Sequence, residues 1–345
     1  MTANPPDPIQ APARAGYPLV GRYLWKLPAW SGPATTLPPL FVGGTGRSGT
    51  TITAKILGAH PDYWMVPFEV RFLSDNGGLC DVVDGKASVG KFERLVTGRW
   101  FDRGPKQGLH LLADKPTLAA AVRELGAGMD KEPLAAAARF VDRVLGPGTQ
   151  AMGAKGWIEM TPGLVQVAPA LARIFPEGRM VHSVRDGRDV ACSVVPLKWG
   201  PGDLNKALDW WAVELLEAFE ACAKAPADRV LTVQLEMLIA DAREAEYTRL
   251  LAFAGLADDP AMRGFFENSA TPERSHRGRW RTDVPADVLP GFAARYRATV
   301  DKLLAAGWPY RPDDAAPIPT TTPAAADPVP APPAESPAPA APPAP

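Results

Sequence analysis

The sequence has few cysteines and no excess of charge of either sign. Only three cysteines occur among 345 residues, far apart and without paired or metal-type spacing, which argues against a disulfide framework and fits a reducing compartment. The 37 basic residues nearly balance the 38 acidic ones, so neither a nucleic acid nor a strongly anionic polymer is expected as a partner. Any anion-binding site must therefore be local.

Long apolar runs are also missing. No stretch approaches the roughly 18 apolar residues that would cross a membrane, and the opening run MTANPPD does not begin a basic region followed by an apolar core. We therefore expect no integral membrane segment and a soluble, cytoplasmic protein.

The two ends of the chain differ from its middle. Residues 312–345 consist largely of Ala and Pro, a composition typical of a disordered tail. Residues 1–16 are rich in the same residue types and are expected to form a flexible N-terminal segment. The chain's 46% hydrophobic content is enough for one large domain, which we place at residues 17–311.

Within this domain, short apolar runs alternate with helical patterns. This alternation predicts an α/β fold of three α/β/α layers with a central, mainly parallel sheet. Strands are expected at 40–42, 180–184 and 229–235, with helices at 51–59 and 189–195 after the first two. Further helical patterns cover 117–125, 133–145, 164–174, 204–222 and 244–254. The less regular residues 68–108 are expected to form a substrate-facing loop region.

A glycine-rich turn follows the first expected strand. Glycines stand at positions 43, 44, 46 and 49, and the next helix opens with two threonines. Small residues let backbone N–H groups approach oxygen atoms closely, and a helix N-terminus favours negative charge, so the turn predicts a P-loop-like phosphate site. Arg47, Ser48, Thr50 and Thr51 can add side-chain donors.

The turn lacks the lysine of a nucleoside-triphosphate loop. When the pattern GxxxxGK[ST] is laid over Gly44 to Thr51, Thr50 occupies the lysine position. That lysine reaches the β- and γ-phosphates, so its absence argues against a P-loop small-molecule kinase while phosphate binding is retained. A non-catalytic nucleotide-binding module is a further alternative.

Two later runs also carry basic residues. Arg185 ends the expected strand 180–184 and precedes Ser193 by about two helical turns; alone, this run would be a charged turn with local ion pairs. The run from Arg277 to Arg281 holds three cations around Trp280, whose indole offers stacking or a cation–π contact.

The order and spacing of these motifs over residues 38–310 resemble those of PAPS-dependent sulfotransferases, as in a bacterial member related to the tyrosylprotein- and carbohydrate-type enzymes. GTGRSGTT resembles the loop that binds the 5′-phosphosulfate of PAPS (3′-phosphoadenosine 5′-phosphosulfate), and Arg185 and Ser193 match the pair that holds its 3′-phosphate. The run around Arg279 resembles a late loop that closes over the nucleotide. The resemblance implies that PAPS, as co-substrate, contacts Gly46, Arg47, Ser48, Gly49, Thr50, Thr51, Arg185, Ser193 and Arg279.

The resemblance also implies which residues perform the chemistry. Sulfuryl transfer needs a base for the acceptor hydroxyl or amine and a group that stabilises the leaving phosphate. Glu69 resembles the family's catalytic base, and Arg47 would stabilise the leaving 5′-phosphate. The alternative for Glu69 is an ordinary loop carboxylate paired with Arg71. His60 is expected to cap a helix end. Because the sequence has no clustered carboxylates or His/Cys spacing, no metal is expected.

Two positions depart from the family pattern. Met160 stands where many relatives have a lysine that contacts the sulfuryl group, and we expect Lys155, Lys115 or Arg71 to replace it. Leu235 stands where relatives commonly carry an aromatic residue that reaches the adenine.

The motifs do not identify the acceptor. Carbohydrates, lipid-linked sugars, phenolic metabolites and peptide tyrosines all carry a suitable hydroxyl, and the composition favours a bacterial enzyme that acts on a sugar or a small metabolite. Trp210 and Trp211, on the expected helix 204–222, are expected to be packing residues rather than acceptor contacts. A homodimer is left open.

Overall fold

Five parallel strands form the centre of the protein in a computed structural model that describes residues 35–311. Their order across the sheet is β2-β3-β1-β4-β5, and each neighbouring pair is parallel. The strands are β1 (Leu40–Gly44), β2 (Tyr63–Met65), β3 (Gly156–Glu159), β4 (Arg179–Val184) and β5 (Val230–Gln234). The predicted flexible segment 1–16, the tail 312–345 and residues 17–34 of the predicted domain lie outside the described residues.

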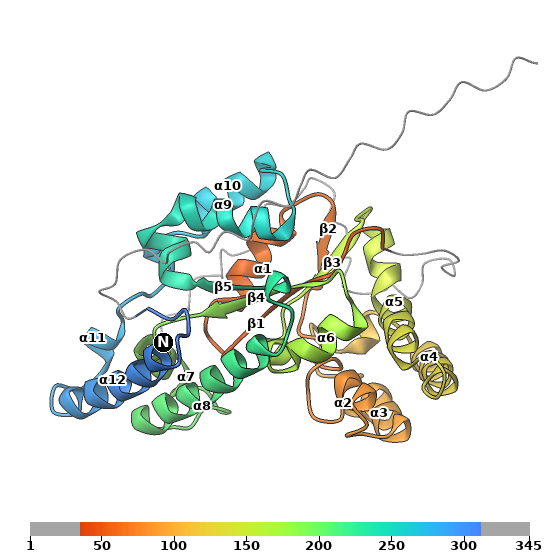
Figure 1. Ribbon diagram of the computed structural model, residues 1–345, viewed down its shortest axis with the longest axis horizontal. Helices are drawn as coiled ribbons and strands as arrows, with labels where there is room; N and C mark the ends of the chain where they lie inside the picture. The colour runs from red at the N-terminus through yellow and green to blue at the C-terminus, as the bar shows by residue number, and fades with distance from the viewer. Residues whose placement is uncertain (1–34, 312–345) are drawn as a thin grey trace, which may run out of the picture. The chain divides into compact units, whose positions relative to one another are not determined.

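Helices cover both faces of this sheet (Figure 1). They are α1 (Thr50–Gly58), α2 (Leu79–Val83), α3 (Val89–Arg94), α4 (Lys115–Gly128), α5 (Pro133–Ala151), α6 (Ala168–Ile174), α7 (Gly187–Val194), α8 (Leu204–Ala223), α9 (Arg243–Ala254), α10 (Pro260–Ser269), α11 (Trp280–Asp283) and α12 (Leu289–Ala305). In Figure 1, α1, α9 and α10 lie on one side of the strands, and α6, α7, α8 and α12 lie on the other. The predicted three-layer fold with a mainly parallel sheet is confirmed.

Alternation along β1 explains why both faces are covered. Leu40 and Val42 pack in the cluster that contains the apolar residues of α1, α9 and α10, whereas Phe41 packs in the cluster that contains those of α6. Successive side chains of a strand point to opposite faces of its sheet. Because β1 is paired on both edges, its side chains are buried on both faces, as is typical of a central parallel strand.

Several elements are missing from the sequence-based prediction. β2 and β3 have only three and four residues, too few to give a clear period. The predicted helix 164–174 is divided into a 3-10 segment, η4 (Pro162–Val167), and α6.

The prediction of a loop region at 68–108 is wrong for three short helical segments. This stretch contains α2, α3 and a π-helical turn at Leu95–Arg99. Phe72, Phe92 and Trp100 are buried in the core formed with α4 and α5. Helices of five or six residues separated by glycine and charge do not produce the longer apolar period that identifies a helix. Within residues 35–311, we find no helix of the length and apolarity needed to cross a bilayer.

Candidate functional site

The glycine-rich turn lies between β1 and α1 and is stabilised by its own serine. The Ser48 hydroxyl donates a hydrogen bond to the Thr45 carbonyl at 2.5 Å, and the Ser183 hydroxyl donates to the Ser48 carbonyl at 2.8 Å. Gly49 precedes α1 with φ of 93°, a conformation that glycine adopts without steric cost. Arg47 adopts φ of 69°, which is uncommon for a residue with a Cβ and occurs often at functional sites.

The donors of this turn are available to a ligand. Arg47 and Thr51 are exposed at its surface, and no side chain caps the start of α1. The first backbone N–H groups of a helix lack partners within the helix and attract anions. Ser48, in contrast, is fully buried, and its hydroxyl supports the turn.

The turn and the predicted second anchor form one site. The Arg47 Nε donates a hydrogen bond to the Ser193 hydroxyl at 3.0 Å, across a sequence separation of 146 residues. The Arg185 guanidinium donates to the Arg47 carbonyl at 3.2 Å. The structure therefore brings together three residues that the sequence analysis selected from separate motifs.

Arg185 is held in a largely buried position, with 9% of its side chain exposed. Its guanidinium also donates to the carbonyls of Ser275 at 3.0 Å and His276 at 3.3 Å. Burial lowers the pKa of Arg185, and the nearby Asp189 carboxylate opposes this effect. Because a guanidinium keeps its proton under all ordinary conditions, the end of β4 presents a fixed positive charge beside the turn.

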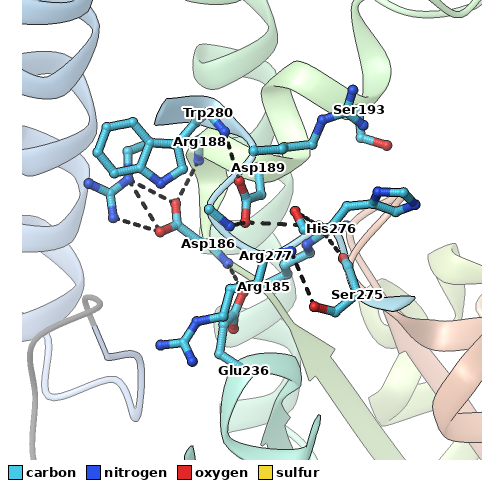
Figure 2. Close-up of polar contacts among 12 residues, drawn as sticks. Arg185, Asp186, Arg188, Asp189, Ser193, Glu236, Ser275, His276, Arg277 and Trp280 are labelled. Atoms are coloured by element: carbon cyan, nitrogen blue, oxygen red, sulfur yellow. Dashed lines mark hydrogen bonds and ion pairs between the residues drawn. The ribbon is translucent and has the colours of Figure 1, made fainter. Parts of the chain in front are cut away.

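Asp189 holds the basic segment 277–281 beside this end of β4 (Figure 2). Its carboxylate accepts hydrogen bonds from the backbone N–H of Gly278 at 2.7 Å and of Trp280 at 3.2 Å. Burial raises the pKa of Asp189, whereas these hydrogen bonds lower it. The segment that the sequence analysis expected to close over a nucleotide is thus fixed beside Arg185.

Trp280 makes the predicted cation–π contact, but with the protein's own residues. The Arg188 guanidinium lies 4.0 Å from the Trp280 ring and 4.2 Å from the Tyr296 ring, and it pairs with the Asp186 carboxylate at 2.6 Å. Arg279 pairs with Asp283, one turn further along α11, at 2.7 Å. Its predicted contact with a nucleotide stays a prediction.

A buried carboxylate lies beneath Arg185. Glu236, just after β5, accepts a hydrogen bond from the Asp186 backbone N–H at 3.0 Å. Burial raises its pKa from 4.5 to about 7, and the Arg185 charge lowers it by less.

Replacing Glu236 with glutamine is expected to flatten the dependence of stability on pH. Between about pH 4.5 and pH 7 the folded protein holds a proton on Glu236 that the unfolded chain releases, so the free energy of unfolding falls as the pH rises through this window. The contribution is full below pH 4.5 and lost above pH 7, and it amounts to at most about 3 kcal/mol. Urea unfolding at pH 5 and pH 7.5 measures it.

The matched control for this experiment is Glu220→Gln, a substitution of an exposed carboxylate on α8. It should leave the pH dependence of the wild type intact. Equal slopes for the wild type and Glu236→Gln would show that Glu236 does not hold the proton.

Glu69 follows β2 at the carboxyl-terminal end of the parallel strands, where the glycine-rich turn also lies. Its side chain is 35% exposed and pairs with the Arg71 guanidinium at 2.7 Å. The Arg103 guanidinium donates to the Glu69 carbonyl at 3.3 Å. Arg103 was not predicted from the sequence, because there it is one more basic residue in an irregular segment and belongs to no motif.

Glu159, which was also not predicted from the sequence, supports the segment that carries Glu69. This fully buried carboxylate at the end of β3 accepts hydrogen bonds from the Val70 N–H at 3.2 Å and from the Thr161 N–H and hydroxyl at 3.0 and 2.7 Å. Burial raises its pKa to about 7, and the three donors lower it by less. Because Val70 follows Glu69 directly, this contact fixes the backbone on which Glu69 stands.

The structure separates the residues expected to replace the family lysine at Met160. Lys155 precedes β3 and therefore lies at the amino-terminal end of the strands, away from the turn, where it pairs with Asp62 at 3.1 Å. The prediction that Lys155 replaces the family lysine is wrong. Lys115 is exposed and lies 4.9 Å from the Phe101 ring. Arg71, which contacts Glu69, is the best placed of the three.

The two remaining predictions concern Leu235 and His60. Leu235 packs against the turn: a Cβ on Gly49 would lie 2.7 Å from its Cδ1. His60 follows α1, and its backbone N–H donates to the Leu57 carbonyl of the last turn at 3.1 Å, as expected of a residue at a helix end, while its imidazole accepts a hydrogen bond from the Asp62 N–H at 3.1 Å. Among residues 35–311, no three His, Cys, Asp or Glu side chains gather where they could hold a metal ion.

The match to one family model agrees with the motifs. A family model described as "Sulfotransferase family" matches residues 38–260, well over half of the chain. A sulfotransferase domain of the Synechococcus PCC 7002 olefin synthase is 18% identical, over 82% of this chain and 100% of that one, with a TM-score of 0.43. STF1 from Mycobacterium tuberculosis H37Rv is 16% identical over 68% of this chain and 72% of that one, with a TM-score of 0.42. STF9 from Mycobacterium avium is 13% identical over 77% and 76%, with a TM-score of 0.42.

Proposed function

Because the chain belongs to the sulfotransferase family and is therefore an enzyme that transfers sulfuryl groups, we propose that its donor is PAPS. The acceptor provides a hydroxyl or amine and is a carbohydrate, a lipid or a small metabolite. Glu69 is the general base of this reaction.

One observation carries the assignment of the donor. The Arg47 Nε and the Ser193 hydroxyl are 3.0 Å apart, and Arg185 contacts the Arg47 carbonyl. A 5′-phosphosulfate at the turn and a 3′-phosphate near Arg185 and Ser193 would therefore belong to one nucleotide. Gly46, Gly49, Thr50 and Thr51 would supply backbone and hydroxyl donors to the 5′ end.

Recognition of a 3′-phosphate gives selectivity against ATP. Arg185 is largely buried, and its guanidinium faces backbone carbonyls together with Asp189. A ribose 3′-hydroxyl carries no charge to attract this cation, whereas a 3′-phosphate would form charge-assisted hydrogen bonds with it, so the 3′-phosphorylated nucleotide is favoured.

The proposed reaction is an in-line displacement at sulfur. Glu69 accepts the proton of the acceptor hydroxyl as the new S–O bond forms, and the bond from sulfur to the 5′-phosphate oxygen breaks. Arg47 stabilises the negative charge left on that phosphate. Arg71 holds the Glu69 carboxylate through the 2.7 Å ion pair, and Glu159 holds its backbone.

The alternatives lack support at the same positions. A small-molecule kinase needs a loop lysine and an acidic residue at a strand end for magnesium. Thr50 stands at the lysine position. Glu159, at the end of β3, is occupied by hydrogen bonds, and Asp186, after β4, is occupied by Arg188. A non-catalytic nucleotide-binding module would bind PAPS without turning it over.

The compartment we propose is a reducing cytoplasm. The three cysteines are free thiols, and burial raises the pKa of Cys192 and Cys222, which keeps these groups as unreactive thiols.

The test is the release of adenosine 3′,5′-bisphosphate (PAP) from PAPS. Chromatography follows the release with phenol, methyl β-D-glucopyranoside and 1-butanol as acceptors. We expect the wild type to release PAP faster with at least one acceptor than without any. Binding of PAPS without acceptor-dependent release would favour the non-catalytic module, and failure to bind PAPS would overturn the donor assignment.

A further inference from the structure

Two indole rings lie against the glycine-rich turn. Trp199, between α7 and α8, and Trp210, on α8, have ring centroids 6.1 Å apart and planes inclined by 66°. A Cβ placed on Gly46 would lie 3.4 Å from the Cη2 atom of each ring. Both indoles therefore lie where a side chain at Gly46, beside Arg47, would contact them.

Trp199 is unusually exposed for so large an apolar side chain, with 61% of the residue accessible. Trp211, the neighbour of Trp210, shows the contrast: it is fully buried and packs against Tyr296 and Tyr310, as the sequence analysis expected. Trp210 also packs against this cluster, as expected, and in addition the edge of its ring lies at the turn. An exposed indole beside a candidate catalytic loop offers a flat apolar face to a ligand.

The residues beside Trp210 connect it to the side of the sheet on which Glu69, the proposed base, lies. Its indole lies close enough to the Glu214 carboxylate to lower the pKa of that group, and Glu214 accepts a hydrogen bond from Gln166 at 2.7 Å. Gln166 belongs to η4, which follows β3. The 3′-phosphate anchor at Arg185 instead follows β4, on the other side of β1 in the sheet.

We propose that Trp199 and Trp210 form the surface on which the acceptor's ring stacks, and that the enzyme selects ring-bearing acceptors over extended alkyl alcohols. The inference rests on the proposed function, because it assumes that the acceptor reaches the turn from the side of Glu69. Phenols and pyranose sugars share the required chemistry, a flat apolar face with a hydroxyl at its edge. Two inclined indoles favour a ring, since aromatic faces and edges recognise ring geometry.

Saturation-transfer NMR on protein loaded with PAP tests this proposal. The probes are phenol, methyl β-D-glucopyranoside and 1-butanol, and the variants are Trp199→Ala and Trp199→Phe. Leu304→Ala removes a different exposed apolar side chain, 49% accessible, from α12 and serves as the control.

We expect at least one ring probe to bind the wild type, with affinity reduced about three- to tenfold in Trp199→Ala and largely restored in Trp199→Phe. Leu304→Ala should bind it as the wild type does. A phenol-only or a sugar-only response identifies which source of the ring the enzyme accepts.

The proposal is overturned if neither ring probe binds the wild type, if Trp199→Ala binds them unchanged, or if 1-butanol binds equally well and loses as much affinity. PAP affinity, measured on every sample, separates this failure from failure of the proposed function. Unchanged PAP binding with no effect of Trp199→Ala refutes the stacking surface alone, whereas failure of the wild type to bind PAP refutes the donor assignment.

Discussion

Substitution of Arg185 by methionine is expected to weaken the binding of PAP by about 100-fold or more, since charge-assisted hydrogen bonds are the strong ones in such sites. Methionine keeps most of the length of the side chain but removes the guanidinium, which is largely buried at the end of β4. Isothermal titration calorimetry with PAP measures the loss directly.

The control for this prediction is the ligand that lacks a 3′-phosphate. Adenosine 5′-monophosphate should bind the wild type more weakly than PAP and should lose little affinity in Arg185→Met. Arg185 also supports the carbonyls of Ser275 and His276, so Ser193→Ala is the second, milder variant. It should lose about tenfold or somewhat more in PAP affinity, the lower end of the value of one hydrogen bond to a charged group. Equal losses for both nucleotides would place the 3′-phosphate elsewhere.

The second large effect is expected at Glu69. Glu69→Gln should lower kcat by about 10²- to 10⁴-fold, the usual contribution of a positioned general base, while PAP affinity stays at the wild-type value. Glutamine preserves the shape of the side chain but cannot accept the proton of the acceptor. Initial rates of PAP release with the best acceptor measure the effect.

Asp75→Asn provides the matched comparison. Asp75 is the other carboxylate that pairs with Arg71, at 3.5 Å, so its substitution alters the same cation without touching the proposed base. Asp75→Asn should keep kcat within about threefold of the wild type, as for a partly exposed ion pair. If Glu69→Gln turned over PAPS at the wild-type rate, Glu69 would not be the base.

The elements of the proposed anion site could be predicted because their signals are local. The apolar run before Gly43, the glycines and the paired threonines define a strand, a turn and a helix within twenty residues, and the structure has β1 and α1 there. Arg185 and Ser193 were found in the same way, from one strand end and one helix. Only the structure brings Ser193 to the Arg47 guanidinium.

The support of the site could not be predicted from the sequence. Glu159 acts on Glu69 through the backbone of Val70, 89 residues away, and a carboxylate on a four-residue strand gives no pattern that announces such a contact. Arg103 and Trp199 were missed for the same reason. The positions of Arg103 and Trp199 depend on how η4, α8 and residues 68–108 pack around the turn. Such packing between distant segments leaves little trace in the local hydrophobic period of the sequence.

We propose that Arg185 and Ser193 bind the 3′-phosphate of a nucleotide. Calorimetric titration of the wild type with PAP and, separately, with ATP tests it most directly. We expect PAP to bind at least about tenfold more tightly, because only PAP presents charge to Arg185 and Ser193. Tighter binding of ATP than of PAP would contradict the claim.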